Sequence, residues 1–296
     1  MAEVRPELHR YCARLTGSVF EGEDIVQDVF VRALVAVDTL DPEVPLKPWL
    51  FRIAHNRSLD YLRSKTVRRS ESIDAAQQVA DELTPDPVEA FVRQEALDTA
   101  ISRFTQLPIV QRSVIILKDV LDYSLQEISD LLDLSVNSVK AALSRGRARL
   151  KELNSEAPAE LRVSKVASVE ATRFSSLFNR RDWDALRSML ADDVHVTQTM
   201  RADRRGAADA GNFFTIYAGV QEFHLAPAYL SGGYGDEVIA VFAHAGDDHP
   251  AYLMKVEWRD SRIVRIRDFR YASYILEGAD LVFAAPDNYR GVDSIP

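Results

Sequence analysis

A group of basic side chains near the middle of this 296-residue chain has the chemistry to bind an anion. Residues 134–153 contain five basic residues and one acidic residue, although the whole chain carries a net charge of −9. A local excess of guanidinium and ammonium groups indicates a phosphate-bearing partner such as nucleic acid, even in an acidic chain. The residues that set this local charge are Lys140, Arg145, Arg147, Arg149, Lys151 and Glu152.

Two short helices joined by a tight turn are predicted to carry this basic group. Ser124 is placed to cap the first helix, with Glu127 completing a capping box, and Ser135 is placed to cap the second. Such a pair is typical of a helix-turn-helix, whose second helix enters the major groove of DNA. The alternative is a plain helical hairpin with a solvated basic end. The predicted DNA-facing residues are Asn137, Ser138, Lys140, Ala141, Ser144, Arg145, Arg147 and Arg149.

An amphipathic helix within residues 1–70 provides a second candidate surface. Its predicted buried stripe consists of Ile25, Val29, Ala33, Leu34 and Val37. Polar residues fall outside this stripe, and by themselves they predict an ordinary solvated face. These residues are Glu23, Asp24, Gln27, Asp28 and Arg32.

A further helix is predicted to begin near Trp49, because Pro48 is favoured at a helix start. Basic groups mixed with aromatic rings suit single-stranded nucleic acid, since arginines meet phosphates and rings stack on bases. Aromatic residues at this spacing are more often core, which is the interpretation taken for Trp49, Phe51 and Tyr61. The outward polar residues here, with the basic ones that follow, are Arg52, Asn56, Arg57, Asp60, Arg63, Lys65, Arg68 and Arg69.

The composition limits the classes of protein to which the chain can belong. A hydrophobic fraction of 47% predicts a folded protein. No apolar run reaches the about 20 residues of a membrane span, and the N-terminus lacks a secretion signal, so we expect a cytoplasmic protein without a membrane partner. The single cysteine, Cys12, excludes a disulfide framework and a multi-cysteine metal site. No metal or cofactor is expected, and residues 244–249, with His244, Asp247, Asp248 and His249, are interpreted as a polar turn.

Charge and helix breakers divide the chain into three modules. Residues 71–90 contain six acidic residues, no basic residue and two prolines, which is typical of a linker. The expected modules are 1–70, 93–153 and 164–290, joined by linkers at 71–92 and 154–163. The first two are expected to be all-α. The last is predicted to be α+β, with two or three helices before a curved antiparallel sheet. Its predicted strands are 194–200, 222–230, 237–244, 251–258 and 262–271.

The first two modules together resemble the extracytoplasmic-function sigma factors of bacterial RNA polymerase. The matching stretches in the first module are EDIVQDVFVRA at 23–33, WLFRIAHNR at 49–57 and DYLR at 60–63. The second module adds Leu107-Pro108, Gln111-Arg112, the helix-turn-helix and RGRARL at 145–150. The resemblance covers about half of the chain. It departs at Asp122 and Asp133, where turn glycines are common, and at Ala141 and Ala142, where polar or basic residues are common.

This resemblance implies a subunit that gives core RNA polymerase its promoter specificity. It places the first module on the clamp helices of the largest polymerase subunit and adds the polymerase flap as a further contact. The implied clamp-binding residues are Asp24, Gln27, Asp28 and Arg32. The implied minus-10 DNA-binding residues are Asn56, Asp60, Arg63, Lys65, Arg68 and Arg69. The implied minus-35 readers are the DNA-facing residues of the helix-turn-helix, Lys140, Ala141, Ser144 and Arg145 foremost.

The third module resembles the SnoaL-like polyketide-cyclase family, which shares a cone fold with nuclear transport factor two. The similar stretches are FNRRDWDAL at 178–186 and LADDV at 190–194. The resemblance implies a pocket in which His and Asp act as acid and base. The candidates are Asp193, His195, His224 and Asp268. Each is interpreted as structural or surface, so no catalytic set is assigned and no enzyme activity is expected.

Three hypotheses follow. The first is a sigma factor whose C-terminal module modulates its activity, either by setting the separation of the two DNA-binding modules or by binding a small molecule. The second is a helix-turn-helix regulator that binds DNA without core polymerase, which leaves the stretch at 23–33 unexplained. The third is an enzyme of the polyketide-cyclase type joined to a DNA-binding module.

Overall fold

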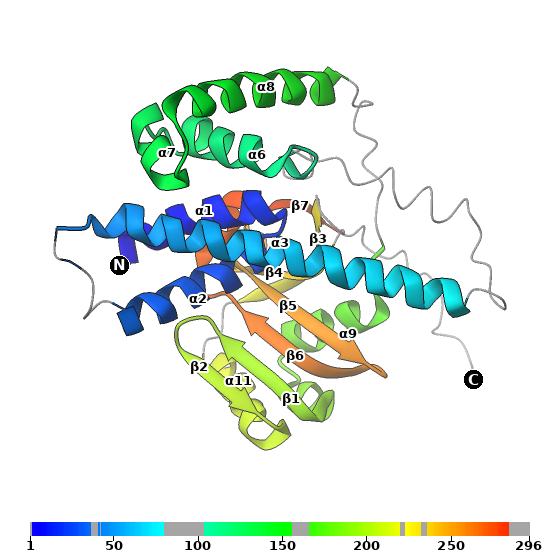
Figure 1. Cartoon of the computed structure of the whole chain (residues 1–296). Helices are drawn as coiled ribbons and strands as arrows, with labels where there is room; N and C mark the ends of the chain where they lie inside the picture. The colour runs from blue at the N-terminus through cyan, green and yellow to red at the C-terminus, as the bar shows by residue number, and fades with distance from the viewer. Residues whose placement is uncertain are drawn as a thin grey trace, which may run out of the picture. The chain divides into compact units, whose positions relative to one another are not determined.

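The chain divides into two compact units (Figure 1). The computed structural model describes residues 2–36, 41, 43–79, 104–155, 166–219, 223–231 and 236–283. The first unit is built from Met1–Leu161, and the second from Arg162–Ser231 and Gly235–Pro296. Both predicted sigma modules therefore belong to one unit. In the part of the chain that the structure describes, no helix is long and apolar enough to cross a membrane.

Three helices build the N-terminal part of the first unit, after the short turn η1 (Ala2–Val4). They are α1 (Arg5–Thr16), α2 (Val19–Ala36) and α3 (Leu46–Val79). Gly17 ends α1 in the left-handed conformation, with φ of 84°, which a residue without Cβ adopts freely. Helix α3 starts three residues before Trp49 and continues as backbone into the predicted linker. The rest of that linker lies outside the described residues.

Helix α2 buries most of its predicted stripe but not all of it. Ile25, Val29 and Ala33 are buried, whereas Leu34 is 63% exposed, so its assignment to the core was wrong. The other correction is Glu23, which was predicted to be solvated and is 1% exposed, in an ion pair with Arg5. Val37 lies outside the described residues.

The C-terminal part of the first unit contains the predicted helix-turn-helix. Its elements are α6 (Ile109–Ile115), the π-helical turn η3 (Ile116–Val120), α7 (Leu125–Leu132) and α8 (Val136–Ser155). The capping box is confirmed: Glu127 N–H donates to Ser124 Oγ at 3.2 Å, and Ser124 N–H donates to the Glu127 carboxylate at 2.7 Å. Asp122 and Asp133 stand where the resembled family commonly has turn glycines. Both have positive φ, at 56° and 55°, the conformation that glycine favours. Non-glycine residues reach this region at a cost of about 1 kcal/mol or more.

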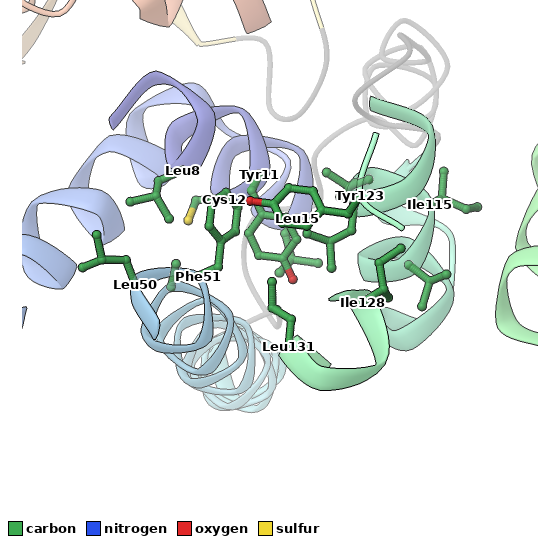
Figure 2. Packing of buried hydrophobic residues seen from close by; sticks show 14 of the residues in the cluster. Leu8, Tyr11, Cys12, Leu15, Leu50, Phe51, Ile115, Tyr123, Ile128 and Leu131 are labelled. Atoms are coloured by element: carbon green, nitrogen blue, oxygen red, sulfur yellow. The ribbon is translucent and has the colours of Figure 1, made fainter. Parts of the chain in front are cut away.

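One hydrophobic core joins the two parts of this unit. Figure 2 shows side chains of α1 and α3 pointing toward side chains from α6, α7 and the turn before α7. Phe51 lies at its centre and is fully buried, which confirms the core interpretation for that ring. The buried residues labelled in Figure 2 are Leu8, Tyr11, Cys12, Leu15, Leu50, Phe51, Ile115, Tyr123, Ile128 and Leu131.

The second unit is α+β, as predicted. Helices α9 and α11 pack on one face of a seven-stranded sheet with the order β2-β1-β6-β5-β4-β3-β7 (Figure 1). The caps of α9 and α10 are Ser168 and Asp182, which accept hydrogen bonds from Ala171 N–H and Ala185 N–H. The helices are α9 (Val169–Asn179), α10 (Trp183–Ser188) and α11 (Ala207–Ala218), with the 3-10 turn η4 (Ser273–Gly278). The strands are β1 (Leu190–Gln198), β2 (Ala202–Arg205), β3 (His224–Ser231), β4 (Glu237–Phe242), β5 (Tyr252–Arg259), β6 (Arg262–Asp268) and β7 (Asp280–Phe283).

The sheet is mixed rather than antiparallel. β1 pairs with β6 in parallel, with Val196 opposite Ile266, whereas the other strand pairs are antiparallel. The prediction missed this pairing because it joins strands far apart in the sequence. It also missed β2, β7 and helix α11, which separates the first two strands from the rest. The layout still agrees with the α+β cone fold that the resemblance implied.

The first prediction concerns His9, which is buried in α1. Its Nε2–H donates to Val19 O at 2.8 Å, and burial lowers its pKa from 6.5 to about 4. Below pH 6.5 the unfolded chain therefore takes up a proton that the folded chain does not. The contribution of His9 to the free energy of unfolding is complete above pH 6.5 and falls as the pH drops toward 4. Between pH 7 and pH 5 this loss is about 2 kcal/mol. Urea unfolding at both pH values measures this loss.

The variant His9→Gln keeps an N–H donor without a titrating ring, so it should lose part of this pH dependence. The matched control is His249→Gln, because His249 is exposed in the polar turn. A wild-type unfolding free energy that is equal at the two pH values would contradict the prediction.

Candidate nucleic-acid interface

Helix α8 presents the predicted major-groove face to solvent. Its N-terminus is capped by Ser135, whose Oγ accepts from Ser138 N–H at 3.1 Å, as predicted. Val139 and Leu143 are buried and hold the helix against its neighbours. The predicted readers are exposed except Ala141, which is half-buried: Asn137, Ser138, Lys140, Ala141, Ser144 and Arg145.

The basic residues of α8 differ in their local partners. The Arg147 guanidinium donates to the Asp119 carboxylate at 2.9 Å, and this bond raises the pKa of Arg147 further. Arg149 donates to Glu152 at 3.0 Å. Among the residues that the structure describes, Lys140 and Arg145 make no ion pair. Lys151, near the C-terminal end of α8, is also exposed and makes no ion pair among these residues. Toward the N-terminal end of the helix, the positive charge without an ion-pair partner lies on Lys140 and Arg145.

Helix α3 carries the predicted minus-10 residues on its exposed side. Asn56, Asp60 and Arg63 are exposed, and Asp60 forms ion pairs with Arg57 at 3.3 Å and with Arg63 at 3.7 Å. The Lys65 ammonium lies 5.7 Å from the centre of the half-buried Tyr61 ring. Arg68 and Arg69 belong to the same helix, and their side chains lie outside the described part of the structure.

The predicted polymerase-binding residues lie along one side of α2. Asp24, Gln27 and Arg32 are exposed, and Asp28 is half-buried between two arginines. Arg32 donates to Asp28 at 2.9 Å, and Arg57 of α3 donates to the same carboxylate oxygen. Burial alone would raise the pKa of Asp28, but these two hydrogen bonds hold that pKa below its usual value.

The sequence reasoning missed two features beside these faces. Val31, Leu34 and Val35 continue the exposed side of α2 toward its C-terminus, and the assumption that Leu34 is core concealed this apolar strip. Arg57 links α3 to α2 through Asp28, so the predicted minus-10 and polymerase-binding residues are held by one ion-pair network. Only the three-dimensional packing of α2 on α3 brings these charges together.

The four predicted pocket residues of the second unit do not form one cluster. Asp193 and His195 alternate along β1 with the buried Val194 and Val196, so they lie on the opposite face from that core. Asp193 is paired with Arg259 at 2.6 Å. His195 is hydrogen-bonded to Asp203 at 2.7 Å, and this bond holds the pKa of Asp203 below its usual value. His224 is half-buried, with Nε2 3.4 Å from Asn179 Nδ2.

Asp268 is the one candidate in the interior of the second unit. It is fully buried and accepts hydrogen bonds from Gln198 at 2.8 Å, from the Tyr217 hydroxyl at 2.9 Å and from Arg270 N–H at 3.0 Å. The Tyr252 hydroxyl lies 2.6 Å from that of Tyr217. Burial raises the pKa of Asp268, and the hydrogen bonds only partly oppose this shift. The cluster ties β1, α11, β5 and β6 together.

Within the ranges that the structure describes, no group of three His, Cys, Asp or Glu side chains is placed to hold a metal ion. The segment at 244–249 is a turn in which His244 N–H donates to Asp247 Oδ2 at 2.9 Å. This contact agrees with the interpretation of the segment as a polar turn.

Comparisons with known proteins identify the first unit. Residues 1–68 match the model of sigma-70 region 2, and residues 95–150 match that of sigma-70 region 4. The ECF RNA polymerase sigma factor SigW of Bacillus subtilis is 34% identical over 157 residues, which are 50% of this chain and 83% of that protein. The RNA polymerase sigma factor CnrH of Cupriavidus metallidurans is 34% identical over 44% of this chain and 72% of its own length.

A solved structure was also found that spans nearly the whole length. The extracytoplasmic function sigma factor SigJ of Mycobacterium tuberculosis is 19% identical over 95% of this chain and 98% of that chain, with a TM-score of 0.35. The family assignment rests on the sequence relatives and on the two sigma region models that match residues 1–68 and 95–150. The chain therefore belongs to the family of ECF RNA polymerase sigma factors.

Proposed function

We propose that this sigma factor directs promoter-specific initiation through three exposed faces of its first unit, and that the second unit modulates this activity. The observation that carries the proposal is the capped recognition helix α8, which presents Lys140 and Arg145 without ion-pair partners among the described residues. The region 4 match over residues 95–150 includes residues 136–150 of this helix. As a polymerase subunit, the protein would act in the cytoplasm.

The minus-35 element would be read by α8. Arginine can donate two hydrogen bonds to the edge of a guanine, and small polar side chains reach neighbouring bases. Arg145 is suited to the first role, with Asn137, Ser138 and Ser144 beside it. Arg147 and Arg149 each have a carboxylate partner, so they would exchange that partner for a backbone phosphate. Their contribution would therefore be smaller than that of Lys140, which has no such exchange to make.

The minus-10 element would be held by α3 as a separated strand. Asn56, Asp60 and Arg63 offer both donors and acceptors to an unpaired base, and Lys65, Arg68 and Arg69 follow as phosphate contacts. Asp60 forms ion pairs with Arg57 and with Arg63, so its carboxylate already accepts from basic groups on the same helix. Exposed aromatic platforms are lacking among the described residues of α3, since Trp49 and Tyr61 pack against the core and Phe51 is buried.

The polymerase clamp helices would bind the side of α2 that carries Asp24, Gln27, Asp28 and Arg32. This side contains both signs of charge and needs no phosphate contact, which suits a protein partner. The polymerase flap is proposed as the partner of the helix-turn-helix part. The second unit would modulate these contacts, and a small-molecule ligand remains a proposed partner of that unit. Its buried Asp268 cluster supports a stable fold and gives no reason to propose catalysis.

Run-off transcription with core RNA polymerase tests the proposal. The full chain and a chain that ends at Leu161, the limit of the first unit, are compared on the same promoter library. We expect both to direct initiation and their transcript levels to differ by at least three-fold. Failure of both chains would reject the sigma function, and equal transcript levels would reject modulation by the second unit.

Arg145 provides a test of promoter reading. We expect Arg145→Ala to weaken binding to a minus-35 duplex by about 1–3 kcal/mol and to relax the preference at one base pair. Fluorescence anisotropy against a set of single-base variants measures both effects. Arg187→Ala is the matched control, because Arg187 is a basic residue of the second unit paired with Asp184. An Arg145→Ala chain with unchanged affinity and preference would contradict the assignment.

Asp24 provides the test for polymerase docking. Reversal of its charge in Asp24→Lys should weaken assembly with core polymerase at least ten-fold while leaving minus-35 duplex binding unchanged. Asp184→Lys, which changes an exposed acid in α10, serves as the control. Surface ion pairs contribute little to stability, so the control should fold normally. Unchanged assembly by Asp24→Lys would remove this face from the polymerase contact.

A further inference from the structure

Two neighbouring strands of the second unit end at the same edge of the sheet. β1 and β6 pair in parallel, so their last residues, Gln198 and Asp268, lie opposite one another (Figure 1). Gln198 Nε2–H donates to Asp268 Oδ2 at 2.8 Å, and Thr199 N–H donates to Asp268 O at 3.1 Å. The Asp268 side chain is fully buried. The two segments that follow these strands therefore leave the sheet from a shared, fixed point.

Each of these segments places an arginine beside the same aromatic ring. After β1, Arg201 lies in a tight turn in which its N–H donates to Gln198 O at 2.9 Å. After β6, Arg270 and Tyr271 follow Asp268 in the chain. The Arg201 guanidinium lies 4.9 Å from the centre of the Tyr271 ring, and that of Arg270 lies 5.9 Å from it. The fold thus brings together two positive charges that are far apart in the sequence.

Further rings hold the Arg270 side chain. Its guanidinium lies 4.9 Å from the centre of the Phe223 ring and 5.8 Å from that of Tyr217. Arg201 is exposed and Arg270 is half-buried, so solvent reaches both side chains. An aromatic ring that covers the face of a guanidinium leaves the N–H groups at its edge able to donate. The rings therefore position the two side chains without using their hydrogen-bond donors.

The two guanidinium groups make no ion pair and donate no hydrogen bond among the residues that the structure describes. Asp268 attracts Arg270 electrostatically, but its carboxyl group accepts from Gln198, from the Tyr217 hydroxyl and from the backbone N–H of Arg270. Burial also raises the pKa of Asp268 and so disfavours its ionised form. The charge of the two arginines is thus available to an anion from outside.

This arrangement suits a small molecule with two negative charges. The edge of a guanidinium donates two parallel hydrogen bonds to a carboxylate or a phosphate. Because both guanidinium groups lie next to one tyrosine ring, a small ligand can reach both of them. The exposed Tyr271 and the half-buried Phe223 offer apolar surface to the body of such a ligand.

We propose that Arg201 and Arg270 form a binding site for a small organic dianion that carries carboxylate or phosphate groups. The neighbouring rings orient the two guanidinium groups. Asp268 is a positioning residue, because it fastens together the two segments that carry the arginines. This inference rests on the proposed function, since it gives a chemical class to the small-molecule ligand proposed for the second unit.

Isothermal titration calorimetry on the full chain tests the site. The anionic probes are phthalate, which has two carboxylates on one ring, and inorganic phosphate. Phthalamide is the neutral probe with the shape of phthalate. The variants are Arg201→Gln and Arg270→Gln, and Arg201→Gln should fold normally because Arg201 is exposed. The matched control is Arg205→Gln, since Arg205 is an exposed arginine of the same β1–β2 hairpin and lies 3.6 Å from Asp203.

We expect both anions to bind with one-to-one stoichiometry and phthalamide not to bind. Each arginine variant should weaken anion binding at least ten-fold, because hydrogen bonds to charged groups are the strong ones. The Arg205→Gln control should stay within two-fold of the unmodified chain. Binding of only one of the two anions would still support the site and would identify its oxyanion.

No saturable binding of either anion, or binding that both arginine variants retain, would overturn the proposal. The titration uses no RNA polymerase, so its failure would leave the proposed sigma function and its modulation by the second unit intact. Those are tested separately by run-off transcription with the full chain and the chain that ends at Leu161.

Discussion

One buried guanidinium connects the two halves of the first unit. Removal of a charged group from water costs several kcal/mol unless its donors are satisfied, and an unsatisfied carbonyl at a helix end is also costly. Arg112 of α6 is 7% exposed and its guanidinium donates to Leu15 O at 2.6 Å, so the charged group and the helix-end carbonyl each gain a partner across the boundary. This hydrogen bond joins the last turn of α1 to α6 beside the core that both parts share.

Apolar burial also joins the two parts of the first unit. Full burial of a large apolar side chain stabilises a fold by about 1.5–3 kcal/mol. The rings of Phe51 in α3 and Tyr123 before α7 lie 5.5 Å apart and are both buried, so the two parts share this stabilisation.

Local signals in the sequence predicted local structure well. The Ser124 capping box, the Ser135 cap and the buried Val139 and Leu143 depend on residues within four positions of one another, and the structure confirms each. The errors concern partners far along the chain. Glu23 is buried because Arg5 reaches it from α1, and the parallel pairing of β1 with β6 joins strands separated by more than sixty residues. Periodicity within one segment contains no information about either partner.

The candidate site residues show the same difference between local signals and distant partners. The exposed residues of α8 follow from helix geometry once the buried stripe is known, so that face could be predicted. The candidates of the second unit could not be grouped, because Asp193 and Asp268 lie on strands whose facing depends on register. Successive side chains along a strand point to opposite faces of the sheet. Asp193 points to the face with the surface ion pair, whereas the Asp268 carboxyl is fully buried. Residue type alone assigned both to one pocket, and only the sheet distinguishes them.

Charge distribution explains how an acidic chain can present a basic face. Asp119 and Glu152, a residue of α8 itself, each accept a hydrogen bond from an arginine of that helix. Their negative charge is thus neutralised locally, and Lys140 and Arg145 remain to face an anion. Beyond the Debye length of about 10 Å, salt largely screens the net charge of −9. Close to the surface of α8 the nearest charges dominate, so the net charge of the whole chain does not exclude an anionic partner there.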